Sequence, residues 1–134
     1  MKKRHLVTWT AQITAAVILA QTLFFKFSGA EESVALFTKL GVEPYGRIGL
    51  GIVELVTVVL LLVPRTAAFG GLLTVGLMVG AVGSHLGPIG IEVNGDGGAL
   101  FGMALVTLAA GLVTIWLRRA ELPVLRTLLP QRAA

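Results

Sequence analysis

A single carboxylate, Glu54, interrupts an apolar stretch that runs from Tyr45 to Val63. If this stretch is a membrane-spanning helix, the spacing from Tyr45 places Glu54 about 13 Å below the start of the span. A carboxylate at that depth must be protonated, paired with a cation or exposed to a watered cavity. Because ionisable residues inside spans generally mark functional sites, Glu54 is our first candidate for proton transfer.

Basic side chains from three stretches can meet Glu54 in the outer half of the membrane. Lys26 closes the first apolar run, Arg47 shares a helical face with Glu54, and His85 lies near the end of the third run. In a ligand site Glu54 accepts or donates a proton, His85 hydrogen-bonds a ligand oxygen, and Lys26 supplies positive charge.

The candidate residues therefore divide into two groups. The proposed catalytic groups are Glu54, His85 and Lys26, and the proposed ligand contacts are Arg47, Thr22 and Asn94. A structural interpretation stays open beside this one: an ion pair of Glu54 with Lys26 or Arg47 joins two helices and carries out no chemistry. No metal site is expected, since the spacing matches no familiar ligand set.

The composition excludes several classes of protein. The chain has 134 residues, of which 55% are hydrophobic and only 13% charged, and its mean hydropathy is +0.88. A domain this small cannot bury so much apolar surface in water, which argues against a soluble enzyme and against nucleic-acid binding. Because the chain has no cysteine, a redox role requires a bound cofactor or a partner subunit.

Four long apolar runs predict an all-α polytopic membrane protein, a four-transmembrane-helix bundle that forms a single domain over residues 1–134. The expected spans are about 6–27, 45–63, 66–87 and 98–117, followed by a cytoplasmic tail over 118–134. In the first outer connection, Val34, Phe37 and Leu40 share one face of a short amphipathic helix.

The distribution of basic residues predicts the orientation of the bundle. Lys and Arg precede the first span, occupy the turn between the second and third spans, and follow the fourth. The positive-inside rule places all of these segments, and hence both termini, in the cytoplasm. The connections on the other side are predominantly acidic, and Asp96 there is expected to cap the last span.

Small residues recur at four-residue spacing in the last two spans. Gly76 and Gly80, Gly83 and Gly87, and Gly98 and Gly102 form such pairs. This pattern allows helix backbones to approach closely, and we expect it to serve packing inside the bundle rather than a dimer interface.

Three stretches, in this order, resemble the DoxX family of small bacterial membrane proteins. They are residues 18–29, which contain Lys26-x-x-Gly29, the glycine-rich residues 46–54, which end in Glu54, and the third apolar run, which ends in Ser84-His85. The resemblance covers about residues 6–117 and implies a four-helix bundle in the bacterial inner membrane. Lys26, Glu54 and His85 match the polar pattern of the family.

The resemblance implies more than one function. Some relatives are associated with a thiosulfate:quinone oxidoreductase, others with membrane-bound oxidative-stress complexes, and distant ones include NACHO-type receptor assembly chaperones. Our first hypothesis is a redox-associated subunit that binds a quinone or a similar lipophilic ligand in an outer polar pocket. The alternative is a non-catalytic assembly factor or structural subunit. The expected partners are the bilayer and either an oxidoreductase subunit or a second copy, and the sequence leaves open whether the protein is an enzyme.

Overall fold

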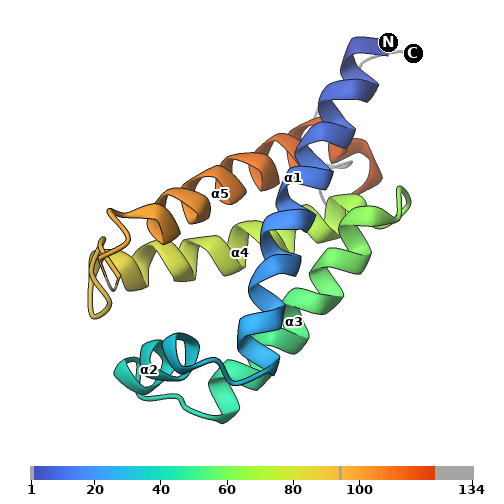
Figure 1. Ribbon diagram of the computed structural model, residues 1–134. Helices are drawn as coiled ribbons and strands as arrows, with labels where there is room; N and C mark the ends of the chain where they lie inside the picture. Colours follow the sequence, from blue (N-terminus) through green and yellow to red (C-terminus); the bar gives the residue numbers. More distant parts are fainter. Residues whose placement is uncertain (1, 94, 123–134) are drawn as a thin grey trace.

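The computed structural model describes residues 2–93 and 95–122 (Figure 1). Over these residues the chain is entirely helical apart from its connections. The elements are α1 (Lys2–Phe27), α2 (Glu31–Lys39), α3 (Tyr45–Leu62), α4 (Ala67–Leu86), α5 (Ala99–Leu117) and the 3₁₀ helix η1 (Arg119–Glu121). Helices α1, α3, α4 and α5 are long and apolar enough to cross a membrane. The predicted all-α bundle with a short helix in the first connection is therefore confirmed.

The four long helices form two pairs that meet at one end. Helix α1 packs against α3 and α5, and α4 packs against the same two helices. The start of α1, the α3–α4 turn and the end of α5 lie together, because Arg4 donates to the carbonyl of Leu117 at 2.7 Å and Arg118 to that of Pro64 at 3.2 Å. We call this the basic end of the bundle. From there the α1–α3 pair and the α4–α5 pair separate toward the opposite end (Figure 1).

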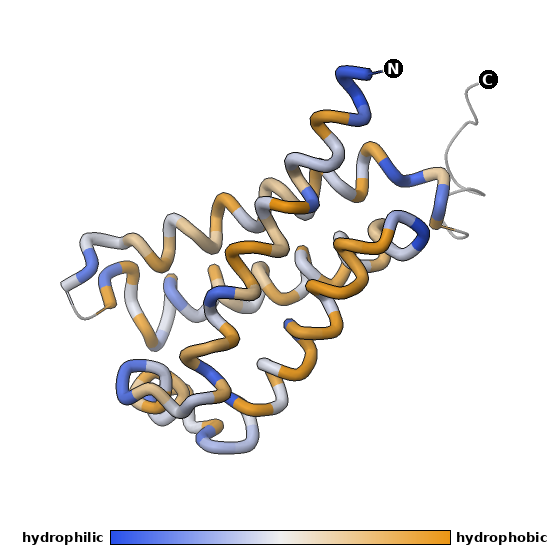
Figure 2. The backbone as a smooth tube through the Cα atoms, turned by 45° about the vertical axis from the view of Figure 1, so that its right-hand side comes forward, coloured by the Kyte–Doolittle hydropathy of each residue, from blue (hydrophilic) through white to orange (hydrophobic). Residues whose placement is uncertain are grey.

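The opposite end carries the acidic connections, and we call it the acidic end. Helix α2 packs there against α1 and α3 and turns its apolar face inward, with Phe37 only 5% exposed. Figure 2 shows apolar residues along the four spans and polar residues mainly at the two ends. Large apolar side chains such as Val17 and Val79 lie outward, as a helix facing lipid requires.

One stripe of polar and small residues on α1, spaced by three or four positions along the sequence, faces the inside of the bundle. Thr8, Gln12, Ala15 and Leu19 follow one another at helical spacing, and each is at most 6% exposed. The polar side chains of this face can be buried because they form hydrogen bonds. Thr8 bonds to the carbonyl of Arg4 in the preceding turn, and Gln12 to that of Leu61 on α3.

Our expectation for the glycine pairs was wrong. A Cβ placed at Gly76, Gly80, Gly83 or Gly102 would meet no atom within 4 Å. The close contacts of α4 with α3 and α5 lie nearer the basic end, at three other glycines. Gly70 lies against the backbone of α3, Gly71 against α5, and Gly111 against Thr74. The two helix pairs diverge toward the acidic end, so Gly76, Gly80, Gly83 and Gly102 have no neighbouring helix to pack against.

Two predictions fall partly outside the described residues. Asn94 and the segment 123–134 lie there, so the ligand contact assigned to Asn94 and most of the cytoplasmic tail stay predictions. The assignment of the whole chain to a single domain stays a prediction for the same reason.

Candidate functional site

The last turn of α1 and the middle of α3 meet in an ion pair inside the bundle. Lys26 Nζ lies 3.0 Å from Glu54 Oε2, and the two side chains are 12% and 5% exposed. The hydroxyl of Thr22, one turn before Lys26, lies 3.3 Å from the same oxygen. Glu54 is thus compensated by a cation from a different span, which explains how a carboxylate is accommodated at this depth.

Arg47 stands beside this pair but has other partners. Its Nε lies 2.9 Å and 3.0 Å from the two carboxylate oxygens of Glu43, and its Nη1 donates to the main-chain carbonyl of Lys26. The guanidinium therefore joins the start of α3 to the end of α1. Among the described residues it makes no hydrogen bond to Glu54. Its contribution is to hold the backbone that carries Lys26.

His85 is buried near the end of α4, with 4% of its surface exposed. Its Nδ1 lies 2.9 Å from the carbonyl oxygen of Gly90, and its ring meets Phe101 edge-on at 5.6 Å between centroids. Because a carbonyl oxygen only accepts, Nδ1 carries the proton in this contact. In the neutral imidazole, Nε2 is then the nitrogen that can accept a hydrogen bond.

A cavity of about 990 Å³ opens between the two helix pairs, and all five α-helices contribute to its wall. Its lining is mainly apolar, with residues such as Leu50, Leu77 and Leu100. The candidate residues Thr22, Lys26, Glu54 and His85 all line it, whereas Arg47 does not. An apolar cavity with a few convergent polar groups is the usual form of a small-molecule site.

Helix α2 and the α4–α5 connection complete the wall of the cavity at the acidic end. Glu32, Ser33 and Leu36 of α2 line the cavity, as do Val93 and Asp96 of the connection. The apolar face of α2 was visible in the sequence. The position of α2 over the cavity follows from its packing against α1 and α3.

Asp96 organises the turn that begins α5, although the N-cap residue of this helix is Gly98 and not Asp96 as we expected. Its carboxylate accepts hydrogen bonds from the backbone N–H groups of Leu100, Val93 and Gly98 at 3.1, 3.1 and 2.8 Å. These bonds stabilise the ionised form and lower the pKa of Asp96 below its ordinary value of 3.8. Gly98, with φ at +84°, occupies the position just before the helix, where glycine is favoured.

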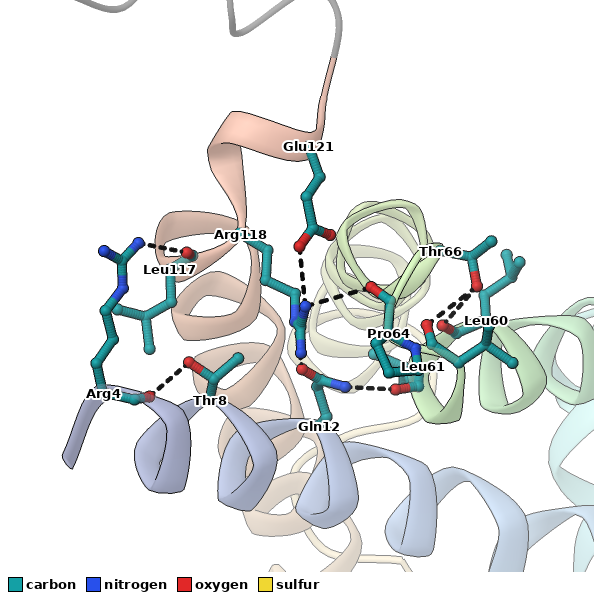
Figure 3. A network of polar contacts seen from close by, with 11 residues as sticks. Arg4, Thr8, Gln12, Leu60, Leu61, Pro64, Thr66, Leu117, Arg118 and Glu121 are labelled. Carbon is teal, nitrogen blue, oxygen red and sulfur yellow. Dashed lines mark hydrogen bonds and ion pairs between the residues drawn. The ribbon is translucent and has the colours of Figure 1, made fainter. Parts of the chain in front are cut away.

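A second polar cluster, at the basic end, was not predicted as a unit (Figure 3). Gln12 is fully buried, donates to the carbonyl of Leu61 at 2.7 Å and accepts from Nε of Arg118. Nη1 of Arg118 reaches Pro64 O at 3.2 Å and Glu121 at 2.9 Å. The sequence signal was present in the polar stripe of α1, but its partner lies 106 positions away along the chain.

Among the described residues no three His, Asp or Glu side chains gather as a metal ion would require.

Comparison with protein families agrees with the resemblance drawn from the sequence. The sequence model of the DoxX-like family matches residues 10–112. Comparisons with curated proteins and with solved structures gave no match.

Proposed function

The chain belongs to the DoxX-like family, and from this premise we propose that it is a redox-associated membrane subunit that binds a quinone or a similar lipophilic ligand. One observation carries the proposal. The Lys26–Glu54 pair and His85 line a single cavity of about 990 Å³ between membrane-spanning helices. Ionisable side chains are costly in a membrane interior. Two charged side chains and a histidine in the wall of one cavity therefore support a ligand-binding role.

The ion pair supplies a proton site whose charge depends on its protonation. While Glu54 is ionised, it neutralises Lys26 at 3.0 Å. When Glu54 takes up a proton, the charge of Lys26 is no longer compensated and stabilises an anionic ligand oxygen nearby. Proton uptake by this chain and charge stabilisation at the ligand are thereby coupled through one contact.

His85 supplies a hydrogen-bonding site at the other part of the wall. Its Nδ1 is held by the carbonyl of Gly90, and Phe101 packs against the edge of the ring. Nε2 is then oriented to accept a hydrogen bond from a ligand hydroxyl, such as that of a reduced quinone. A partner subunit is part of the proposal, because the chain has no cysteine to exchange electrons itself.

We place the protein in the bacterial inner membrane with its basic end in the cytoplasm. The basic end gathers Lys2, Lys3, Arg4, Arg65 and Arg118 around the start of α1, the α3–α4 turn and the end of α5. The positive-inside rule then puts the cavity in the half of the bilayer away from the cytoplasm. Cysteine accessibility at Lys3 and Glu92, probed from each side of the membrane, tests this orientation.

Quinone binding to the purified protein in detergent tests the function. We expect saturable binding that Glu54→Gln and His85→Ala each weaken by about tenfold or more, a loss of ~1.4 kcal/mol. The chain offers a matched control for each variant. Glu121→Gln changes a carboxylate at the basic end, and His5→Ala removes a histidine that lies far from the cavity. Absence of saturable binding, or equal binding by all four variants, would refute the proposal.

A specific observation also favours the second candidate, an assembly factor or structural subunit without turnover. Lys26 and Glu54 touch each other directly, and Arg47 fastens the adjoining backbone, which is what a purely structural junction between α1 and α3 requires. Crosslinking followed by mass spectrometry in native membranes separates the candidates. A stable protein partner whose recovery is insensitive to Glu54→Gln, together with no ligand binding, favours the structural role.

A further inference from the structure

We propose that the cavity takes up its ligand sideways from the bilayer, between α3 and α4, and that the ligand is a quinone whose long isoprenoid chain stays in this opening. Gly76 and Gly80 form the α4 edge of the opening. The inference rests on the proposed function and extends it to the route of uptake and to the part of the ligand that the spans recognise.

The glycines of α4 show where α3 and α4 separate. Near the basic end, a Cβ at Gly70 would come within 2.8 Å of the backbone nitrogen of Leu61, so the two helices are in direct contact there. Further along, a Cβ at Gly76 or Gly80 would meet nothing within 4 Å, yet both residues line the cavity. Along this edge of α4 there is therefore open space in place of a packed neighbouring helix.

The residues beside these glycines are apolar and keep a large accessible surface. Val53 of α3 is 40% exposed, and Leu72 and Leu73 of α4 are 45% and 37% exposed, although all three also line the cavity. In the proposed route these side chains border the opening toward lipid. The opening is thus bordered by side chains that lipid chains and an isoprenoid chain can contact without desolvating a polar group.

The opposite flank, between α1 and α5, is bridged. Gln21 Nε2 donates to Met103 Sδ at 3.1 Å, and both residues line the cavity. Sideways passage on that flank requires this contact to break, whereas a Cβ at Gly76 or Gly80 would meet no atom within 4 Å. The geometry therefore favours the α3–α4 side.

The polarity of the lining matches an amphiphile oriented like the lipids of the surrounding leaflet. Along α4 the lining runs from Leu72 to Ser84 and His85, a length of about 20 Å at the rise of an α-helix. The end toward the middle of the membrane is apolar, and the polar groups lie toward the acidic end. A ring with hydrogen-bonding oxygens lies at His85 and the ion pair, and an attached chain points toward the membrane centre.

A small ring without a chain has a separate path. Glu32 of α2 and Asp96 of the α4–α5 connection line the cavity at its polar end, where the bundle meets water. A quinone carrying only a short alkyl group can reach the site from that side. The two ligands therefore distinguish the route through the bilayer from the site itself.

The experiment uses the full chain in vesicles of phosphatidylethanolamine and phosphatidylglycerol, with a long-chain isoprenoid quinone and a short-chain analogue of the same ring. We compare the wild type, Gly76→Phe/Gly80→Phe and the matched control Gly83→Phe. Gly83 has the same open surroundings on the same helix but does not line the cavity. The expected result is that Gly76→Phe/Gly80→Phe loses about tenfold or more in affinity for the long-chain quinone only, and that Gly83→Phe binds both ligands normally.

The remaining outcomes have distinct meanings. If the wild type binds neither ligand, the proposed function fails and the route fails with it. If the wild type binds the quinones and Gly76→Phe/Gly80→Phe binds the long-chain form equally well, only the route fails. Loss of both ligands in that variant would show that the glycines border the ring site, which also overturns the route.

Single thiols supply a second measurement that does not depend on these bulky substitutions. Because the chain has no cysteine, Gly80→Cys and Gly83→Cys each introduce one reactive thiol. The long-chain quinone should protect the thiol of Gly80→Cys, and not that of Gly83→Cys, against a lipid-soluble maleimide. Equal labelling of both in the presence of bound quinone, or protection by phospholipid alone, would overturn the inference.

Discussion

The two ends of the bundle use polar side chains in opposite ways. At the basic end, Gln12 is fully buried and Arg118 joins it to the α3–α4 turn and to η1, so these polar atoms are used by protein partners. At the acidic end, Lys26, Glu54 and His85 are also bonded, but they stand in the wall of a cavity. The difference is that the helices around the second set of polar residues diverge and leave a cavity beside it.

The largest expected effect is at the acidic end, from removal of one partner of the ion pair. Lys26→Met leaves the Glu54 carboxylate uncompensated and should destabilise the protein by ~3–5 kcal/mol, measured by unfolding in mixed detergent micelles. The double variant Lys26→Met/Glu54→Leu should recover wild-type stability, because apolar residues replace a buried pair at little cost. It should nevertheless bind no quinone. A double variant that remains as unstable as Lys26→Met would mean that the pair serves structure.

The basic end should respond in the opposite sense. Gln12→Leu removes a hydrogen-bond partner from the carbonyl of Leu61 and from Arg118, and should lower the free energy of unfolding by ~1–3 kcal/mol. Quinone affinity should not change. Glu121→Gln is the control, since its carboxylate is 36% exposed and its loss should shift stability by less than about 0.5 kcal/mol. A loss of ligand binding in Gln12→Leu with normal stability would remove the distinction between the two ends.

A pair of glycine substitutions compares packing near the basic end with packing near the acidic end. Gly111→Ala places a Cβ 2.9 Å from Cγ2 of Thr74 and should destabilise the protein by ~1–3 kcal/mol. Gly83→Ala meets no neighbour within 4 Å and should stabilise its helix by ~0.5–1 kcal/mol. Both are read from the same unfolding curves. Equal destabilisation by the two substitutions would contradict the divergence of the helices.

The smallest effect concerns the turn at the edge of the cavity. Since the folded pKa of Asp96 is lowered, its stabilising contribution is complete above the ordinary pKa and is lost as the pH falls through the folded value, that is, below about 4. Hydrogen-exchange protection of the Gly98 and Leu100 amides should fall in this range. In Asp96→Asn the same protection should be weaker and independent of pH there. Unchanged protection at low pH would show that these hydrogen bonds do not hold the turn.

Most of the fold could be predicted from the sequence, but the site only in part. The spans, the amphipathic helix and the inward stripe of α1 follow from local hydrophobicity, since each helix must bury its polar face and expose its apolar one. The glycine pairs were misjudged because spacing does not say whether a neighbour is present. Arg47 was expected at the site from its place on α3, but Glu43, four residues earlier, is its partner.

The sequence by itself determined that a carboxylate lies inside a span and that it must be protonated, paired with a cation or exposed to a watered cavity. Only the tertiary structure decided that the partner is Lys26 and that both residues border a cavity. The physical reason is that transfer into hydrocarbon is a property of each segment alone. The ion pair and the cavity depend on how far neighbouring helices lie from each other. That distance results from contacts such as those at Gly70 and Gly111 near the basic end.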